Sequence, residues 1–176
     1  MSAARALLQE LLQLCALGLL VGLACWPFNV LDRLQDQLLG LMPHFGGGPW
    51  GPASLALAAA PVLVIPLLLA LQRGVWARGA GSGIPQTMTS IEEPERADAL
   101  LAPAPTLQRL GLWSLATLVL LPMGREGPVL QVGAAVAWAV RRRVPALLPR
   151  LPHADLLVLA AGAGLAGGFK IGRAHV

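Results

Sequence analysis

The stretch from Pro122 to Gln131, PMGREGPVLQ, places an arginine and a glutamate side by side between two runs of apolar residues. A charged side chain in apolar surroundings is unfavourable unless water, a partner or a function compensates for the lost hydration. The role of Arg125 and Glu126 therefore depends on what the apolar segments on both sides form. These segments also determine the fold class of the whole chain.

The composition of the chain indicates a membrane protein. Of its 176 residues, 56% are hydrophobic and 12% are charged, and the mean hydropathy is +0.66. An ordinary soluble domain has about 25% charged residues. The charged residues separate apolar segments and do not alternate with aromatic residues along one face, so we expect no nucleic-acid partner.

Two uncharged segments are long enough to cross about 30 Å of hydrocarbon as helices. The first covers residues 11–31, where Pro27 is expected to kink the far end, and Asp32 follows at the expected membrane interface. The second covers residues 53–72 and contains two internal prolines. These segments predict two full membrane spans.

The distribution of arginine predicts how these spans are oriented. Residues 42–52, MPHFGGGPWGP, are rich in turn residues and contain neither Lys nor Arg, whereas Arg73 and Arg78 follow the second span. By the positive-inside rule, the arginine-bearing loop faces the cytoplasm and the glycine-rich loop faces outward. The N-terminus, with Arg5, is then expected to be cytoplasmic too.

Three later apolar runs are too short to cross a bilayer alone. They cover residues 110–123, 127–140 and 156–169, with 14 residues each. A single run of this length would also suit a core helix of a soluble protein. Three in series after two full spans are typical of the discontinuous helices of channels and transporters, whose ends meet near the bilayer midplane.

Two glycine-rich pentapeptides are expected to open helices at such a meeting point. GSGIP occupies residues 81–85 and GREGP residues 124–128, and each carries a proline suited to a first helical turn. The unpaired N–H groups and the macrodipole of a helix N-terminus bind anions. Ser82 adds a hydroxyl donor suited to a halide.

Glu126 is itself an anion that can occupy the second helix N-terminus. A carboxylate in that position would block an anion site, and its protonation would let the side chain leave. Anion movement and proton movement would then be coupled. A structural ion pair between Glu126 and Arg125 is the alternative interpretation of the two residues.

The two motifs, in this order on a hydrophobic chain with broken helices, resemble the CLC family of chloride channels and chloride/proton antiporters. The resemblance runs from about residue 10 to Phe169 and includes the segment AAGAGLAGGF at 160–169. It implies an all-α, polytopic membrane protein with broken and tilted helices, the first part of the CLC-type inverted-repeat fold. Transport by such a protein involves no enzymatic chemistry, cofactor or metal.

The resemblance also implies roles for individual residues. Ser82 would contact a central chloride, the backbone around Glu126 would help to form an outer anion site, and Glu126 would be the gate. The anion-binding residues would be Ser82, Gly83, Ile84, Arg125, Glu126 and Gly127. The helix-opening residues would be Gly81, Pro85, Gly124 and Pro128. The implied partners are chloride, protons, the lipid bilayer of a bacterial inner membrane and a second copy of the chain; channel and antiporter both remain open.

Some features of the family are not present in the sequence. A later GxFxP-type loop does not occur, and the chain has no tyrosine to reach the central chloride. We therefore expect residues 1–169 to form the N-terminal part of a CLC transmembrane domain, and the chain as given to be an incomplete, inactive fragment. Residues 170–176 are expected to be a non-native tail, because IGRAHV is the translation of ATC GGA AGA GCA CAC GTC, which resembles a sequencing adapter.

The segment GAGLAG at 162–167 matches the dinucleotide-binding pattern G-x-G-x-x-G. That pattern needs a following helix and an acidic residue about 20 positions later, which these 176 residues do not contain. Close helix packing through Gly164 and Gly168 explains the segment better. The alternatives to anion transport are thus a soluble dinucleotide-binding enzyme fragment and a small structural membrane protein.

Overall fold

The computed structural model describes residues 3–41 and 48–169, and all regular structure in these two ranges is helical. The all-α prediction is therefore confirmed. The tail at 170–176 and most of the glycine-rich loop, residues 42–47, lie outside the described residues, so the predictions made for them stay predictions.

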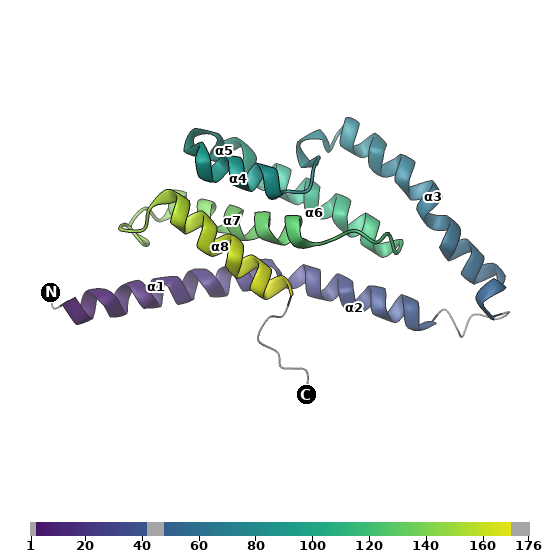
Figure 1. The fold of residues 1–176 in the computed structure, drawn as a ribbon, viewed down its shortest axis with the longest axis horizontal. Coiled ribbons are helices and arrows are strands. Elements are labelled where there is room, and N and C mark those ends of the chain that lie inside the picture. Colours follow the sequence, from purple (N-terminus) through teal and green to yellow (C-terminus); the bar gives the residue numbers. More distant parts are fainter. Residues whose placement is uncertain (1–2, 42–47, 170–176) are drawn as a thin grey trace.

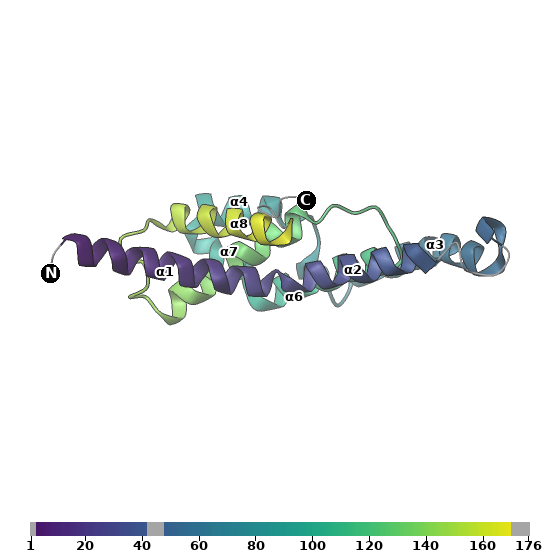
Figure 2. The same cartoon turned by 90° about the horizontal axis from the view of Figure 1, so that it is seen from below.

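The N-terminal part forms a long arm of two successive helices, α1 (Ala3–Ala24) and α2 (Trp26–Leu41). Both views show these helices following one another along the long axis of the molecule (Figures 1 and 2). The break between them falls at Cys25, two residues before the expected kink at Pro27. Helical structure continues past residue 31 to Leu41, so that Asp32 lies within a helix.

The second predicted span is helix α3 (Pro52–Arg73), which agrees with the expected range of 53–72 to within one residue at each end. A short 3-10 turn, η2 (Gly48–Trp50), precedes it. The segment Ala4–Leu41 and helix α3 are both long and apolar enough to cross a membrane. Only 11% of the most apolar window of α3 is buried within the chain, as expected of a helix that faces lipid.

Three helices of intermediate length follow the membrane-spanning candidates. These are α6 (Pro103–Leu118), α7 (Glu126–Arg143) and α8 (His153–Gly168), with 16, 18 and 16 residues. Between α3 and α6 lie α4 (Ile84–Glu92), α5 (Ala97–Leu100) and the 3-10 turns η3 (Ala77–Gly79) and η4 (Pro94–Arg96). The short helices confirm the prediction of a discontinuous helical fold.

Helix α7 is the centre of the packing, with α1, α4, α6 and α8 around it. It approaches α8 most closely through glycine: a Cβ on Gly133 would overlap the carbonyl oxygen of Ala160, and a Cβ on Gly164 would overlap that of Val129. Residues 162–167 lie inside α8, and helix rather than strand precedes them. The dinucleotide-binding alternative is therefore wrong, and GAGLAG is a helix-packing segment.

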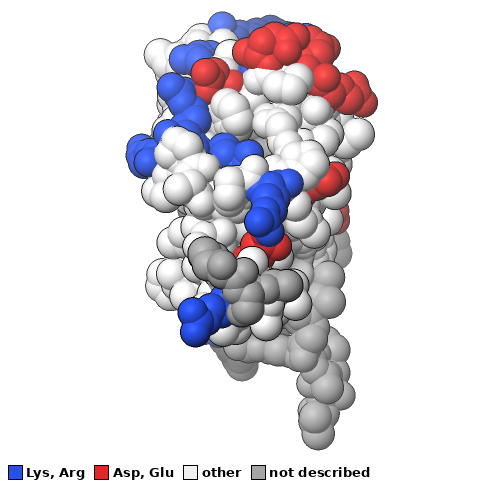
Figure 3. Space-filling model, turned by 90° about the vertical axis from the view of Figure 1, so that its left-hand side faces the viewer, with Lys and Arg blue, Asp and Glu red and all other residues white. Residues whose placement is uncertain are grey.

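Charged side chains gather at the end of the molecule where α4 gives way to α5 (Figure 3). There Arg142, in the last turn of α7, pairs with Asp98 at 2.6 Å. Glu93 pairs with Arg96 at 3.3 Å, and both side chains are about half exposed. We call this exposed end the polar rim; it comprises Glu92, Glu93, Arg96, Asp98 and Arg142. The charged residues around Glu126 form a separate group.

Candidate anion site

The two glycine-rich motifs begin two helices that meet. Helix α4 begins at Ile84 after Gly83, and α7 begins at Glu126 after Arg125. A Cβ on Gly83 would lie 2.7 Å from the carbonyl oxygen of Gly127, and a Cβ on Gly127 would overlap the carbonyl oxygen of Ser82. Gly83 also has a φ of +101°, which disfavours any other residue. Glycine is thus what allows the two helix starts to touch.

A pocket of about 320 Å³, which we call the α4–α7 pocket, opens at this contact. Ser82 and Ile84 line it from the first motif, and Glu126 and Gly127 line it from the second. The Ser82 hydroxyl oxygen accepts the N–H of Ile84 at 3.4 Å, which leaves the hydroxyl hydrogen available for donation. The pocket therefore combines a hydroxyl donor with two helix N-termini.

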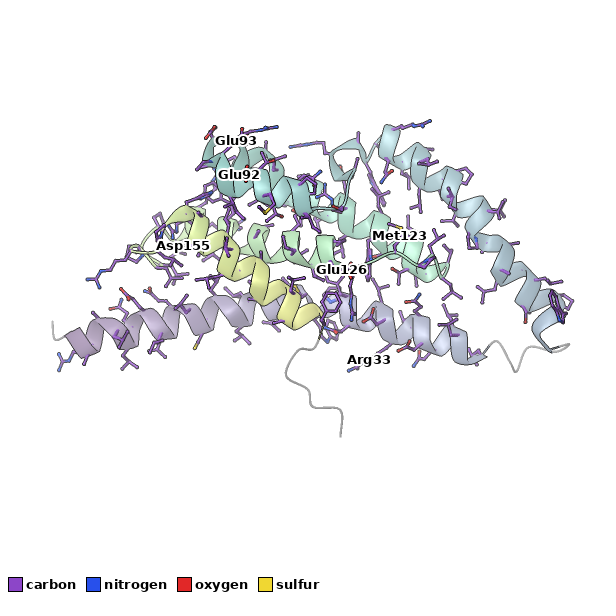
Figure 4. All side chains as sticks on the ribbon, in the orientation of Figure 1. Arg33, Glu92, Glu93, Met123, Glu126 and Asp155 are labelled. Atoms are coloured by element: carbon purple, nitrogen blue, oxygen red, sulfur yellow. The ribbon has the colours of Figure 1, made fainter. Side chains whose placement is uncertain are left out.

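A second pocket of about 250 Å³, the α2–α7 pocket, is lined by Asp32, Arg125 and Phe169 among others. Glu126 lines both pockets. Its carboxylate folds back over Gly124, because a Cβ on Gly124 would overlap the Glu126 Oε2 atom. Figure 4 shows Glu126 at the start of α7, near the middle of the molecule. Glu92 and Glu93, at the end of α4, lie apart from it in the polar rim. Glu126 is thus placed at the boundary between two cavities.

Arg125 does not use Glu126 as its ion-pair partner in the structure. Its guanidinium pairs with the carboxylate of Asp32 on α2, and both side chains are 22% exposed. The same guanidinium lies 4.6 Å from the ring centroid of Phe169, which is a cation–π contact. The pairing could not be predicted from the sequence, where Asp32 is only the first charged residue after the apolar run at 11–31.

A buried arginine on α6 fixes the first motif against α7. Arg109 is 3% exposed and donates from Nε to the carbonyl of Gly81 at 3.0 Å and from Nη2 to that of Ala80 at 2.7 Å. Its Nη1 donates to the side-chain oxygen of Gln131, whose amide in turn donates to the carbonyl of Leu100 at 3.1 Å. Sequence reasoning missed Arg109, although it stands directly before the apolar run at 110–123.

Trp113 lies on the wall that the two pockets share. It lines both of them and is 3% exposed. Its ring packs against Phe28 with a centroid distance of 4.8 Å, whereas its indole N–H has no acceptor among the described residues. Trp113 is therefore the aromatic member of the shared wall, which Met123, Gly124 and Glu126 complete.

Two helix N-termini that meet at a pocket in a chain with membrane-spanning helices form the arrangement expected of an anion site in a channel or transporter. A family model described as "Voltage gated chloride channel" matches residues 62–171, which is more than half of the chain and includes both motifs. The chain therefore belongs to the voltage-gated chloride channel family, the CLC family, and is a membrane protein. No curated protein and no solved structure matches it significantly.

Proposed function

We propose that the protein carries chloride, or a similar monovalent anion, through the α4–α7 pocket, with Glu126 as the gate. The observation that supports this most strongly is the contact between the starts of α4 and α7, which brings two helix N-termini to one cavity. Family membership already assigns chloride transport in general terms. The proposal adds the residues that perform it.

The chemistry of the α4–α7 pocket suits a halide. A halide only accepts hydrogen bonds, and the Ser82 hydroxyl together with the backbone of residues 125–127 would supply donors. The N–H groups of Gly83 and Ile84 donate to the Gln86 side chain and to the Ser82 hydroxyl oxygen, so they would have to exchange these acceptors for the anion. Arg109 lines the same pocket and adds a permanent positive charge. Because each of its three nitrogens already donates one hydrogen bond, to Gly81, Gln131 or Ala80, we assign Arg109 to positioning and long-range attraction and not to direct binding.

The position of Glu126 suits a competitor of the anion. Its carboxylate lies beside the α7 N-terminus and lines both pockets, so the charged side chain would block passage between them. Protonation would remove the charge and release the side chain. Proton movement coupled to chloride movement follows from this mechanism, in keeping with an antiporter as well as with a proton-gated channel.

We also propose that the N-terminus is cytoplasmic and that the protein acts as a homodimer in a bacterial inner membrane. Arg73 ends α3 and Arg78 lies in η3, so the loop after the second span carries the positive charge that marks a cytoplasmic side. The homodimer and the bacterial membrane rest on the family resemblance alone. Protease accessibility in oriented vesicles tests the orientation.

The decisive experiment replaces Glu126 with Gln in the complete gene product. Glu126→Gln keeps the size of the side chain and mimics its protonated form, so chloride efflux from liposomes should persist and lose its pH dependence. Glu92→Gln is the matched control, because Glu92 is an exposed glutamate at the polar rim, and it should keep the wild-type profile. An unchanged pH profile in Glu126→Gln would show that Glu126 is not the gate.

Two further outcomes separate the alternatives. Loss of folded protein in Glu126→Gln would favour a structural role, although Arg125 keeps its Asp32 partner in this variant and is not left uncompensated. Absence of chloride flux in the wild type would favour a small membrane protein with a structural role. Detergent extraction behaviour and flux can be measured on the same preparation.

A further inference from the structure

We propose that Asp32 is a positioning residue for the Glu126 gate and acts on it through Arg125. This inference rests on the proposed function, because it concerns the same gate. It adds a residue from α2, a helix that contributes to neither glycine-rich motif and lies before the segment matched by the family model.

Arg125 is held from three sides. Its backbone directly precedes the first residue of α7, its guanidinium pairs with Asp32 on α2, and Phe169 at the end of α8 covers the guanidinium at 4.6 Å. Arg125 and Asp32 have equal exposure, 22%, so neither charge is fully hydrated. A partly desolvated pair of this kind is more strongly coupled than an exposed surface ion pair.

Asp32 and Glu126 therefore compete for the same guanidinium. Asp32, Arg125 and Glu126 all line the α2–α7 pocket. Arg125 is adjacent to Glu126 in the chain, yet it pairs with Asp32 across 93 positions of sequence. Asp32 thus engages the guanidinium from the side of α2, whereas Glu126 forms no ion pair with it among the described residues.

The other charged groups that face Glu126 are few. Across the α2–α7 pocket they are Arg125 and Asp32, and across the α4–α7 pocket the one charged lining residue is Arg109 on α6. The lining residues from the first glycine-rich motif, at 81–85, and from the end of α8 are uncharged. Arg109 is held by its own three acceptors, so Asp32 is the group whose removal changes the charge next to the gate most directly.

Removal of the Asp32 charge should favour the closed gate. Without its counter-ion, the Arg125 guanidinium would stabilise the charged form of the neighbouring carboxylate, Glu126. Opening by protonation would then need a more acidic solution. The shift in the pH at which the gate opens would come from the lost charge of residue 32. A substitution that preserves this charge should therefore not shift it.

The experiment measures chloride efflux against pH for Asp32→Asn in the complete gene product. The midpoint of the profile should move to lower pH by about one unit, the lower end of the effect of an adjacent guanidinium on a carboxyl group. Asp32→Glu keeps the charge and should keep the wild-type midpoint. Asp36→Asn makes the same change one helical turn further along α2, at an exposed position, and should also leave the midpoint in place.

A second pair of variants keeps the test valid if Asp32→Asn does not fold. Arg125→Gln removes the guanidinium and should move the midpoint to higher pH. If Asp32 acts through Arg125, adding Asp32→Asn to Arg125→Gln should leave the midpoint at its Arg125→Gln value, because the guanidinium that Asp32 engages is no longer present. A double variant whose midpoint lies below that of Arg125→Gln alone would show that Asp32 acts on Glu126 directly and would overturn the inference.

The outcome for Glu126→Gln separates this inference from the proposed function. If Glu126→Gln retains a pH-dependent flux, the proposed gate is wrong and the inference falls with it. If Glu126→Gln abolishes the pH dependence while folded Asp32→Asn keeps the wild-type midpoint, the gate stands and Asp32 has only a structural role in joining α2 to α7.

Discussion

Replacing Gly127 with alanine tests the contact on which the candidate site depends. A methyl group at this position would overlap the carbonyl oxygen of Ser82 and would lie 3.2 Å from the Ser82 Cβ. The obstructing atom belongs to the backbone, so it cannot turn away as the end of a flexible side chain could. The starts of α4 and α7 must therefore move apart in the variant.

The expected magnitude is the difference between two effects. Overpacking at a tight contact costs about 1–3 kcal/mol, whereas exchanging glycine for alanine within a helix gains up to about 1 kcal/mol. The free energy of unfolding should therefore fall by about 1–2 kcal/mol. For a chain of this length, that corresponds to a decrease of about 2–8 °C in the melting temperature.

Circular dichroism of the detergent-solubilised protein measures this melting temperature, and Gly162→Ala is the matched control. Gly162 lies on the exposed side of α8, and a Cβ there would meet no atom within 4 Å, so the control should melt at or above the wild-type temperature. Added chloride should raise the melting temperature of the wild type more than that of Gly127→Ala, because ligand binding stabilises the folded state. A Gly127→Ala variant as stable as the control would refute the described contact.

Three other variants probe the same region. Ser82→Ala should reduce the preference for chloride over nitrate in flux assays while total flux continues, because the backbone donors remain; unchanged selectivity would count against Ser82. Arg109→Met should lower the free energy of unfolding by about 1–3 kcal/mol, since it leaves the buried side-chain oxygen of Gln131 without this donor, and Arg109→Lys should fall between that variant and the wild type. Trp113→Phe should lower the melting temperature only slightly, because the smaller ring loses buried contacts while an indole N–H without an acceptor among the described residues is removed; a decrease as large as that of Trp113→Ala would contradict that environment.

Local chemistry explains why much of the fold could be predicted from the sequence. The range of α3 follows from an uncharged segment of membrane-spanning length, ended by Arg73. The starts of α4 and α7 follow from glycine and proline at fixed offsets, which specify a turn and then a first helical turn. The contact between the two motifs is compatible with those signals but does not follow from either motif alone.

The features that were not predicted depend on residues far apart in the chain. Arg125 and Asp32 are separated by 93 positions, and the contacts of Arg109 span 22 to 29 positions. The apolar run at 110–123 also does not remain helical to its end, because α6 ends at Leu118 and Leu120 has a φ of +60°. Pro122 was the available signal for that end, since the residue before a proline disfavours helical geometry.

The Arg109 network has a consequence for the biosynthesis of the protein. Helix α4 has nine residues and is therefore about 14 Å long, so it cannot insert into a bilayer as an independent span. Its starting loop is held by a guanidinium that also requires Gln131, a residue that the ribosome adds later than all of α4 and α6. The pocket therefore forms only after the first turns of α7 have been synthesised, so α4 reaches its final position in the membrane later than the long helices that precede it.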